Sequence, residues 1–167
     1  MSTQAPLKQT IMSGQTVAGA MIFEFFTPGM SNILSNAGAK FAVSPGYTSA
    51  VGQACRDQGL SLLPGVATGS EIMMAQEDGY TDLKFFPAMQ AGGTAMLKAW
   101  SGPFFDVRFC PTGGVTSQNA TEFLSLPNVA CVGGSWLVPA DALAQGDWAR
   151  IEKLAREASQ LKRASLN

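Results

Sequence analysis

The chain has 167 residues, of which 46% are hydrophobic, and this length and apolar content are sufficient for one domain with a hydrophobic core. The chain has 11 Lys and Arg residues and 12 Asp and Glu residues, which gives a formal net charge of -1. This balance excludes the basic surface typical of proteins that bind nucleic acid or an anionic membrane. The absence of histidine excludes Ser-His and Cys-His nucleophile activation and every His-ligated metal site.

Short apolar runs alternate with helix-like segments from residue 17 onward, which is the pattern of successive βα units around a parallel sheet. Six strands are predicted, at Val17–Phe25, Phe41–Pro45, Ser61–Val66, Asp82–Pro87, Asp106–Pro111 and Asn128–Gly133. Helices are predicted at Ser49–Gln58, Ser70–Asp78 and Ala95–Trp100. A closed eight-stranded barrel usually needs about 200 residues or more, so the sheet stays open, closes with fewer strands, or is completed by another subunit.

The last segment, Asp147–Lys162, is predicted to be an amphipathic helix with Asp147 as its N-cap. Its apolar residues share one face, which we expect to close over the domain.

Targeting and cysteine patterns are those of a cytoplasmic protein. No apolar run approaches the roughly 18 residues of a transmembrane helix, and the start MSTQAPLKQT lacks the layout of a signal peptide. Cys55, Cys110 and Cys131 show no C-x-x-C spacing, so we interpret them as reduced packing residues.

Lys84 is the candidate nucleophile. Period-two alternation in the strand at Asp82–Pro87 places Asp82, Lys84 and Phe86 on one face, and Leu83 and Phe85 on the other. If helices cover the second face, Lys84 points inward, where desolvation favours the neutral amine that forms imines with ketones. The alternatives are a lysine that extends from the strand end into solvent, or one paired with Asp82.

Two glycine-rich segments follow the last two predicted strands, at Pro111–Gly114 and Gly133–Ser135. Loops at this position in barrels often bind phosphate through backbone N–H groups. The alternative is ordinary turn chemistry, because glycine serves in any tight loop. Arg108 lies within a strand, where a solvated position or an ion pair is a better interpretation than a substrate contact.

Several motifs occur together in order: Phe41–Gly46, Leu63–Val66, Lys84–Ala88, Val107–Gly114 and Gly133–Ala140. With these motifs, residues 40–163 resemble the class I (Schiff-base) 2-keto-3-deoxy-6-phosphogluconate (KDPG) and 4-hydroxy-2-oxoglutarate (KHG) aldolases. The resemblance implies an α/β fold of TIM type, a (β/α) barrel here with about six strands instead of eight. It also implies a homotrimer, no metal or other cofactor, and the lyase reaction of the Entner-Doudoroff pathway that gives pyruvate and an aldehyde.

The same resemblance implies roles for individual residues. Lys84 would form the Schiff base, with Pro45 and Phe86 lining the pyruvate end. Thr112 would bind the keto-acid carboxylate, and the phosphate would contact Gly113, Gly114, Gly134 and Ser135.

The N-terminal segment, residues 1–39, departs from that pattern. It lacks the family's E-V-T-L-R motif, which carries the general acid-base Glu, and its G-A-G-T motif. Residues 7–40 instead resemble the start of the metal-dependent dihydroxyheptenedioate-type aldolases, which suggests a chimera or an internal deletion. Glu24 is the only carboxylate in this strand and is the candidate replacement for proton transfer.

Two alternatives therefore stand beside a class I aldolase. The first is a catalytically impaired barrel remnant that binds phosphate or pyruvate, or only oligomerises through an unpaired sheet edge. The second is a metal-dependent aldolase built on the N-terminal strand, although no histidine is present to hold the metal.

Overall fold

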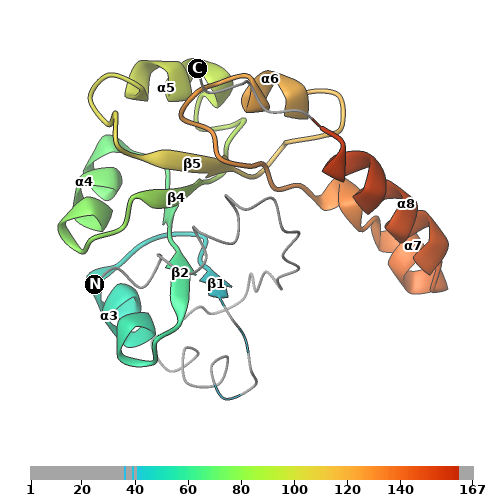
Figure 1. Cartoon of the computed structure of the whole chain (residues 1–167), viewed down its shortest axis with the longest axis horizontal. Helices are drawn as coiled ribbons and strands as arrows, with labels where there is room; N and C mark the ends of the chain where they lie inside the picture. Colours follow the sequence, from blue (N-terminus) through green and yellow to red (C-terminus); the bar gives the residue numbers. More distant parts are fainter. Residues whose placement is uncertain (1–35, 37–38, 40, 162–167) are drawn as a thin grey trace. The chain divides into compact units, whose positions relative to one another are not determined.

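The computed structural model describes residues 36, 39 and 41–161, and the chain divides into two compact units. The first comprises Met1–Phe86 and Asp106–Arg108, and the second Pro87–Phe105 and Phe109–Asn167. Figure 1 shows strands alternating with helices along the chain, which confirms the predicted α/β class. The strand predicted at Val17–Phe25 lies outside the described residues. No described helix is long and apolar enough to cross a membrane.

The strand pairs described in the first unit are parallel, as predicted from the βα alternation. β1 pairs with β2, and β3 with β4. The sequence predicts one strand over Ser61–Val66, but Pro64, which has no N–H to donate, divides it into β2 and β3. The described elements of this unit are β1 (Phe41–Val43), α3 (Ser49–Asp57), β2 (Ser61–Leu63), β3 (Gly65–Val66), α4 (Gly69–Glu77) and β4 (Asp82–Phe85).

The two helices described in the first unit, α3 and α4, begin at capped residues. The Thr48 side chain accepts from the Val51 N–H at the start of α3. At the start of α4, Thr68 and Glu71 form a reciprocal capping box, which satisfies N–H groups that have no partner within the helix. The loops before these helices therefore contain their own start signals.

The core of the first unit includes two apolar side chains of β4. Leu83 and Phe85 are fully buried, with Leu62 of β2 and Ile72 of α4. These side chains form the apolar layer under the helices, so Asp82 and Lys84 project from the opposite face of the strand.

The second unit contains an apolar cluster in which Trp100 packs on Phe109, with ring centroids 5.4 Å apart. β5 spans Arg108–Pro111. Its first residue, Arg108, belongs to the first unit, and its other residues belong to the second unit. The Arg108 N–H donates to the Thr81 carbonyl (2.9 Å). The remaining elements are α5 (Gly93–Trp100), α6 (Ala120–Leu124), the 3-10 turn η1 (Ser135–Leu137), α7 (Ala140–Gln145) and α8 (Trp148–Ser159).

The strand predicted at Asn128–Gly133 is wrong. Only two isolated parallel bridges form there, between Phe109 and Val129 and between Thr112 and Gly133. Three residue steps on β5 thus correspond to four on the partner segment, and the additional residue interrupts the ladder as a bulge does.

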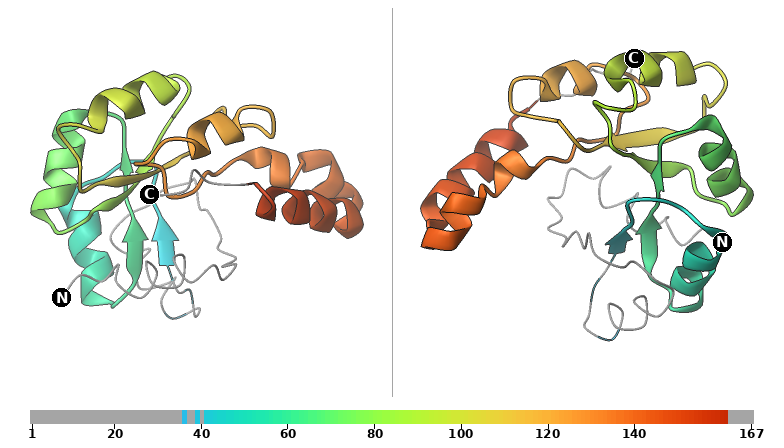
Figure 2. Two further views of the ribbon diagram at one scale, coloured as in Figure 1. Left: turned by 45° about the horizontal axis from the view of Figure 1, so that its top comes forward. Right: turned by 180° about the vertical axis from the view of Figure 1, so that it is seen from behind.

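Helix α8 begins where the sequence predicts, because the Asp147 side chain accepts from the Arg150 N–H (3.0 Å). Its predicted packing over the domain is wrong: none of its residues is buried, and Trp148 is 64% exposed. The helix lies beside the short α7, as Figures 1 and 2 show, and this neighbour is too short to cover the apolar face.

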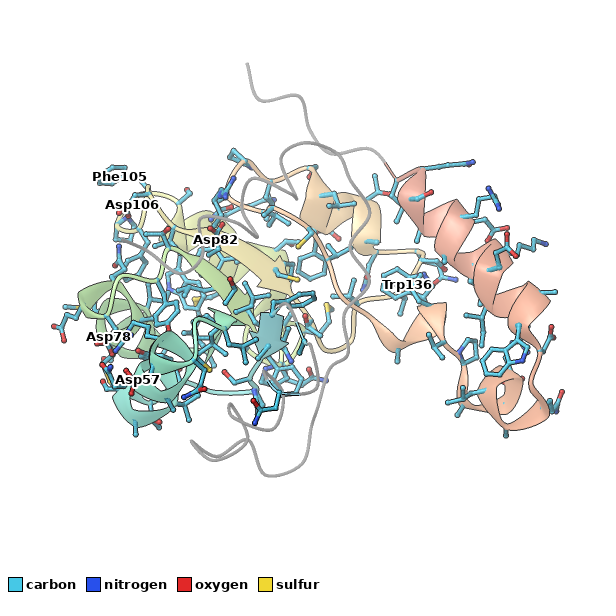
Figure 3. The ribbon with its side chains drawn as sticks, turned by 60° about the horizontal axis from the view of Figure 1, so that its bottom comes forward. Asp57, Asp78, Asp82, Phe105, Asp106 and Trp136 are labelled. Carbon is cyan, nitrogen blue, oxygen red and sulfur yellow. The ribbon has the colours of Figure 1, made fainter. Side chains whose placement is uncertain are left out.

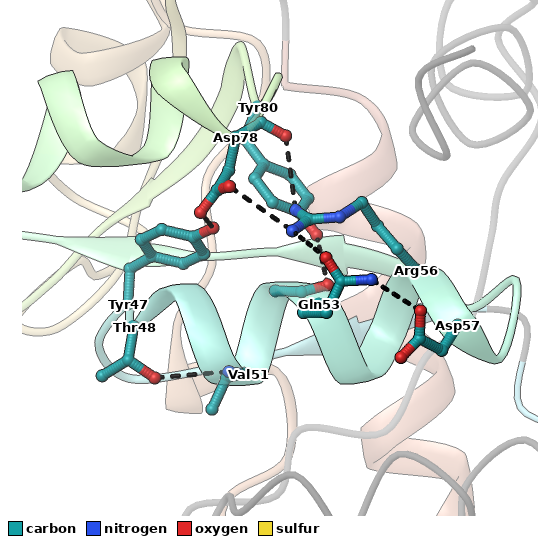
Figure 4. Close-up of polar contacts among 9 residues, drawn as sticks. Tyr47, Thr48, Val51, Gln53, Arg56, Asp57, Asp78 and Tyr80 are labelled. Atoms are coloured by element: carbon teal, nitrogen blue, oxygen red, sulfur yellow. Dashed lines mark hydrogen bonds and ion pairs between the residues drawn. The ribbon is translucent and has the colours of Figure 1, made fainter.

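A polar cluster joins α3 to the end of α4 in the first unit (Figure 4). The Tyr47 hydroxyl donates to the Asp78 carboxylate, and Arg56 donates to the other oxygen of the same carboxylate (3.4 Å). The Tyr80 hydroxyl donates to the Gly52 carbonyl of α3 (3.1 Å), and the Arg56 guanidinium lies over the Tyr80 ring. The cluster thus links two helices through their polar ends.

We predict that Asp78→Asn destabilises the protein by about 1–2 kcal/mol at neutral pH, and that this difference shrinks in acid. The hydrogen bond from Tyr47 is the main cause that lowers the pKa of Asp78, while burial raises the pKa of Tyr47 and keeps it a donor. A depressed pKa contributes stability above the unfolded value near 3.9, and this stability is lost as the pH falls through the folded value.

Urea unfolding of wild type and variant at pH 7 and pH 3 measures this effect. Asp57→Asn, at an exposed position at the end of α3, is the control. A stability difference that is equally large at both pH values would contradict the assignment to the Asp78 carboxylate.

Candidate functional site

Lys84 is a buried lysine in the middle of β4. Its side chain is 1% exposed, and its Nζ lies 4.4 Å from the centroid of the Phe86 ring. Lys84 and Phe86 therefore share a face of the strand, as predicted. Such burial contradicts the alternative in which Lys84 extends into solvent.

Three residues form a row at the level of Lys84: Lys84 itself in β4, Gly65 in β3, and Pro45 after the end of β1. The β3–β4 register places Gly65 opposite Lys84, and the Lys84 N–H donates to the Pro64 carbonyl (2.8 Å). On its other side, Gly65 is so close to Pro45 that an added Cβ would lie 2.3 Å from the Pro45 carbonyl carbon and oxygen. Gly65 thus lies next to both Pro45 and Lys84, and Phe86 contacts Lys84. The first unit therefore brings these predicted site residues together.

Asp82, labelled in Figure 3, lies two residues before Lys84 and forms an ion pair with Arg108. Nε and Nη2 of Arg108 both donate to the same Asp82 oxygen, at 3.0 and 2.7 Å. Both side chains are less than a quarter exposed. The prediction that Arg108 serves an ion pair is confirmed.

The glycine-rich segments of the second unit lie next to each other. Thr112 and Gly133 form a parallel bridge, and a Cβ on Gly133 would lie 2.9 Å from the Thr112 Oγ1. Thr112 is 6% exposed, and its hydroxyl donates to the Cys110 carbonyl (3.3 Å). Thr112 is thus fixed by contacts on both its backbone and its side chain.

Gly113 and Gly114 follow Thr112 with φ values of 96° and 74°, which L side chains rarely adopt. Gly134 lies against the ring of Trp136, which Figure 3 labels, and against the Val115 carbonyl. Ser135 begins η1 and is exposed. The second unit therefore brings together the five residues predicted to bind carboxylate and phosphate, Thr112, Gly113, Gly114, Gly134 and Ser135.

Two predictions on other groups have different outcomes. Glu24, the candidate for proton transfer, lies outside the described residues. None of the three cysteines, which all lie within the described residues, forms a disulfide. Cys55 is buried, and burial raises the pKa of its thiol, whereas Cys110 and Cys131 are half-buried. Within residues 36, 39 and 41–161, no group of three or more Cys, Asp or Glu could hold a metal ion.

Sequence reasoning missed two residues that shape these surroundings. Gly65 lies within the motif Leu63–Val66, but its contact with Pro45 is not visible in a local pattern. Asn119 was not considered, although the spacing Thr116-x-x-Asn119 resembles a capping box, and the two residues do bond reciprocally. That spacing is the signal by which Asn119 could have been found.

Comparisons with known proteins agree on one family. The family described as "Aldolase: KDPG and KHG aldolase" matches residues 14–154. The chain is 53% identical over 122 residues to the 2-dehydro-3-deoxy-phosphogluconate aldolase of Pseudomonas aeruginosa, covering 73% of this chain and 56% of that protein. It is 51% identical over 125 residues to the KHG/KDPG aldolase of Escherichia coli K12, covering 75% and 59%. The chain thus spans less than two thirds of these relatives' length.

Solved structures show the same likeness. The KDPG aldolase of Zymomonas mobilis ZM4 with 3-phosphoglycerate has a TM-score of 0.82 at 42% identity, covering 91% of this chain and 70% of that one. The KDPG aldolase of Legionella pneumophila, with pyruvate captured as a covalent carbinolamine, has a TM-score of 0.81 at 44% identity, covering 95% and 76%.

The comparisons do not support the chimera suggested for the N-terminal segment. The family match begins at residue 14 and therefore includes most of the segment before residue 40. An HpcH/HpaI aldolase of Desulfitobacterium hafniense is only 13% identical, with a TM-score of 0.55, which is a likeness of fold alone. The resemblance over residues 7–40 was therefore insufficient to assign a second family.

Proposed function

The chain belongs to the KDPG and KHG aldolase family, and from this we propose that it is a class I aldolase that cleaves KDPG or 4-hydroxy-2-oxoglutarate through an imine on Lys84. Pyruvate and an aldehyde are the products. The observation that carries the proposal is the buried Lys84 on β4, which lies over Phe86 and in one row with Gly65 and Pro45. The Legionella relative, which was captured with pyruvate as a carbinolamine, supports this chemistry.

The proposed reaction begins when the neutral Lys84 amine attacks the keto carbon of the substrate. Loss of water from the carbinolamine gives an iminium ion, which withdraws electrons from the adjacent carbon. Removal of the proton from the C4 hydroxyl breaks the C3–C4 bond and releases the aldehyde, and the electron pair moves into an enamine. Protonation of the enamine and hydrolysis of the imine then release pyruvate and restore the amine.

The surroundings of Lys84 suit this sequence. Removal of the side chain from water disfavours the ammonium form, which is not nucleophilic. The electron-rich face of Phe86, 4.4 Å from Nζ, can in turn stabilise the cationic iminium. Glu24 remains our candidate for the proton transfers, which general acid-base groups usually accelerate by about 10²- to 10⁴-fold.

The second unit supplies the proposed anion contacts. Thr112 would hold the keto-acid carboxylate, and backbone N–H groups of Gly113, Gly114, Gly134 and Ser135 would bind the phosphate. The Zymomonas relative with bound 3-phosphoglycerate is consistent with a family that binds phosphorylated acids. We also propose that the strands belong to a (β/α) barrel and that the chain assembles as a trimer.

The alternative of a catalytically impaired remnant rests on one sequence observation, that residues 1–39 lack the E-V-T-L-R motif with the general acid-base Glu. Pyruvate release from KDPG, coupled to lactate dehydrogenase with and without EDTA, separates the candidates. We expect steady turnover that EDTA does not change. A folded chain that releases no pyruvate would favour the remnant, and activity lost with EDTA would favour a metal-dependent aldolase.

A further inference from the structure

The loop from Thr112 to Thr116 is fixed by hydrogen bonds to its carbonyl groups. The Ala88 N–H donates to the Thr112 carbonyl (2.8 Å), and the Met89 N–H donates to the Gly113 carbonyl (3.1 Å). The next carbonyl, that of Gly114, accepts from the side-chain Nδ2 of Asn119 (3.1 Å). Backbone groups thus hold the first two carbonyls, and one side chain holds the third.

Asn119 makes a second bond to the same loop. Its Oδ1 accepts from the Thr116 N–H (2.8 Å), while its own N–H donates to the Thr116 Oγ1 (3.4 Å). The amide side chain therefore spans Val115, with its donor on one side and its acceptor on the other. No other neutral side chain as short as asparagine carries both groups in a planar amide.

These bonds determine where the loop N–H groups point. In a trans peptide the carbonyl of one residue and the N–H of the next point in opposite directions. Because Asn119 binds the Gly114 carbonyl, the Val115 N–H points away from Asn119, and because Met89 binds the Gly113 carbonyl, the Gly114 N–H points away from Met89. N–H groups that leave a loop in this way form anion-binding concavities.

We propose that Asn119 is a positioning residue for phosphate recognition: it holds the Gly113–Gly114 loop in the conformation that binds the substrate phosphate. This inference rests on the proposed function, in which that loop contacts phosphate. It predicts selectivity between the two candidate substrates, since KDPG carries a phosphate and 4-hydroxy-2-oxoglutarate does not.

The first test compares wild type with Asn119→Ala on both substrates. We expect the KM for KDPG to rise by about 5- to 30-fold, while kcat/KM for 4-hydroxy-2-oxoglutarate changes by less than about twofold. Asn119→Asp keeps the acceptor for the Thr116 N–H, but it places a carboxylate oxygen, which cannot donate, next to the Gly114 carbonyl. We therefore expect Asn119→Asp to bind KDPG at least as weakly as Asn119→Ala does. Gln118→Ala, at the exposed neighbouring position, should change neither substrate. Equal losses on both substrates, or no loss on KDPG, would overturn the proposal.

The second test requires no turnover and so separates this inference from the proposed function. Inorganic phosphate is titrated into wild type and Asn119→Ala, and the backbone amide signals of Gly114 and Val115 are followed by NMR. We expect saturable shifts in wild type and a dissociation constant raised by about 5-fold or more in the variant. Absence of these shifts in wild type, or equal affinity in both proteins, overturns the inference whether or not the chain cleaves KDPG.

Discussion

Lys84→Met will abolish the pyruvate adduct that borohydride traps in the wild-type protein. Borohydride reduces an imine between Lys84 and pyruvate to a stable secondary amine, which peptide mass mapping locates. Methionine has a similar volume and no nucleophile, so it can fill the buried position without forming an imine. We expect kcat/KM for KDPG cleavage to fall by a factor on the order of 10³ or more, as when other covalent nucleophiles are removed.

The control for this prediction is Lys98→Met. Lys98 is an exposed lysine in the last turn of α5, and its loss should leave both adduct and turnover unchanged. Thermal unfolding shows whether each variant is folded. An adduct that persists in folded Lys84→Met, on any lysine, would refute the assignment of the imine to Lys84.

The sequence predicted the face on which Lys84 lies, because alternation in a strand is a local property. The contact between the Lys84 Nζ and the Phe86 ring confirms that these two residues share a face. The start of α8 was predictable for a similar reason, since Asp147 caps a helix only a few residues away. In both cases the deciding contacts connect residues close in the chain.

The strand predicted at Asn128–Gly133 failed because apolar content does not reveal register. Whether that segment forms a ladder depends on its match to β5, about 20 residues earlier, and the offset changes between the Phe109 and Thr112 bridges. The packing of α8 was mispredicted for a related reason. An apolar face indicates that a helix needs a partner, but it does not identify the partner.

The residues implied by the family resemblance fall into two sets. Pro45, Lys84 and Phe86 come together through contacts in the first unit, and the glycine segments after Thr112 and Gly133 come together in the second. Motif order predicted both sets. Asn119 was missed since its importance comes from the carbonyl that it binds, and no composition or periodicity argument indicates that bond.

Gly65→Ala will be among the most damaging single substitutions in the first unit. An added Cβ would lie 2.3 Å from the Pro45 carbonyl carbon and oxygen, and 2.6 Å from the Ser44 carbonyl oxygen. These neighbours are backbone atoms, so no side-chain rotation can relieve the overlap, and β3 must move away from the segment Ser44–Pro45 that follows β1. We expect the free energy of unfolding to fall by about 3 kcal/mol, the upper range for overpacking.

The same substitution should impair imine formation more than its effect on stability alone would predict. The Lys84 N–H donates a hydrogen bond to the carbonyl of Pro64, the residue before Gly65, and Lys84 lies opposite Gly65 in the β3–β4 register. Displacement of β3 therefore moves Lys84 relative to Pro45, and a shift of about 1 Å can slow a positioned reaction by about 10²-fold.

Borohydride trapping rates under conditions where Gly65→Ala is fully folded measure this effect. Gly46→Ala is the matched control, because nothing lies within 4 Å of its added Cβ, and it should trap pyruvate at the wild-type rate. If the two alanine variants unfold at the same urea concentration and trap at the same rate, Gly65 does not set the spacing between Pro45 and Lys84.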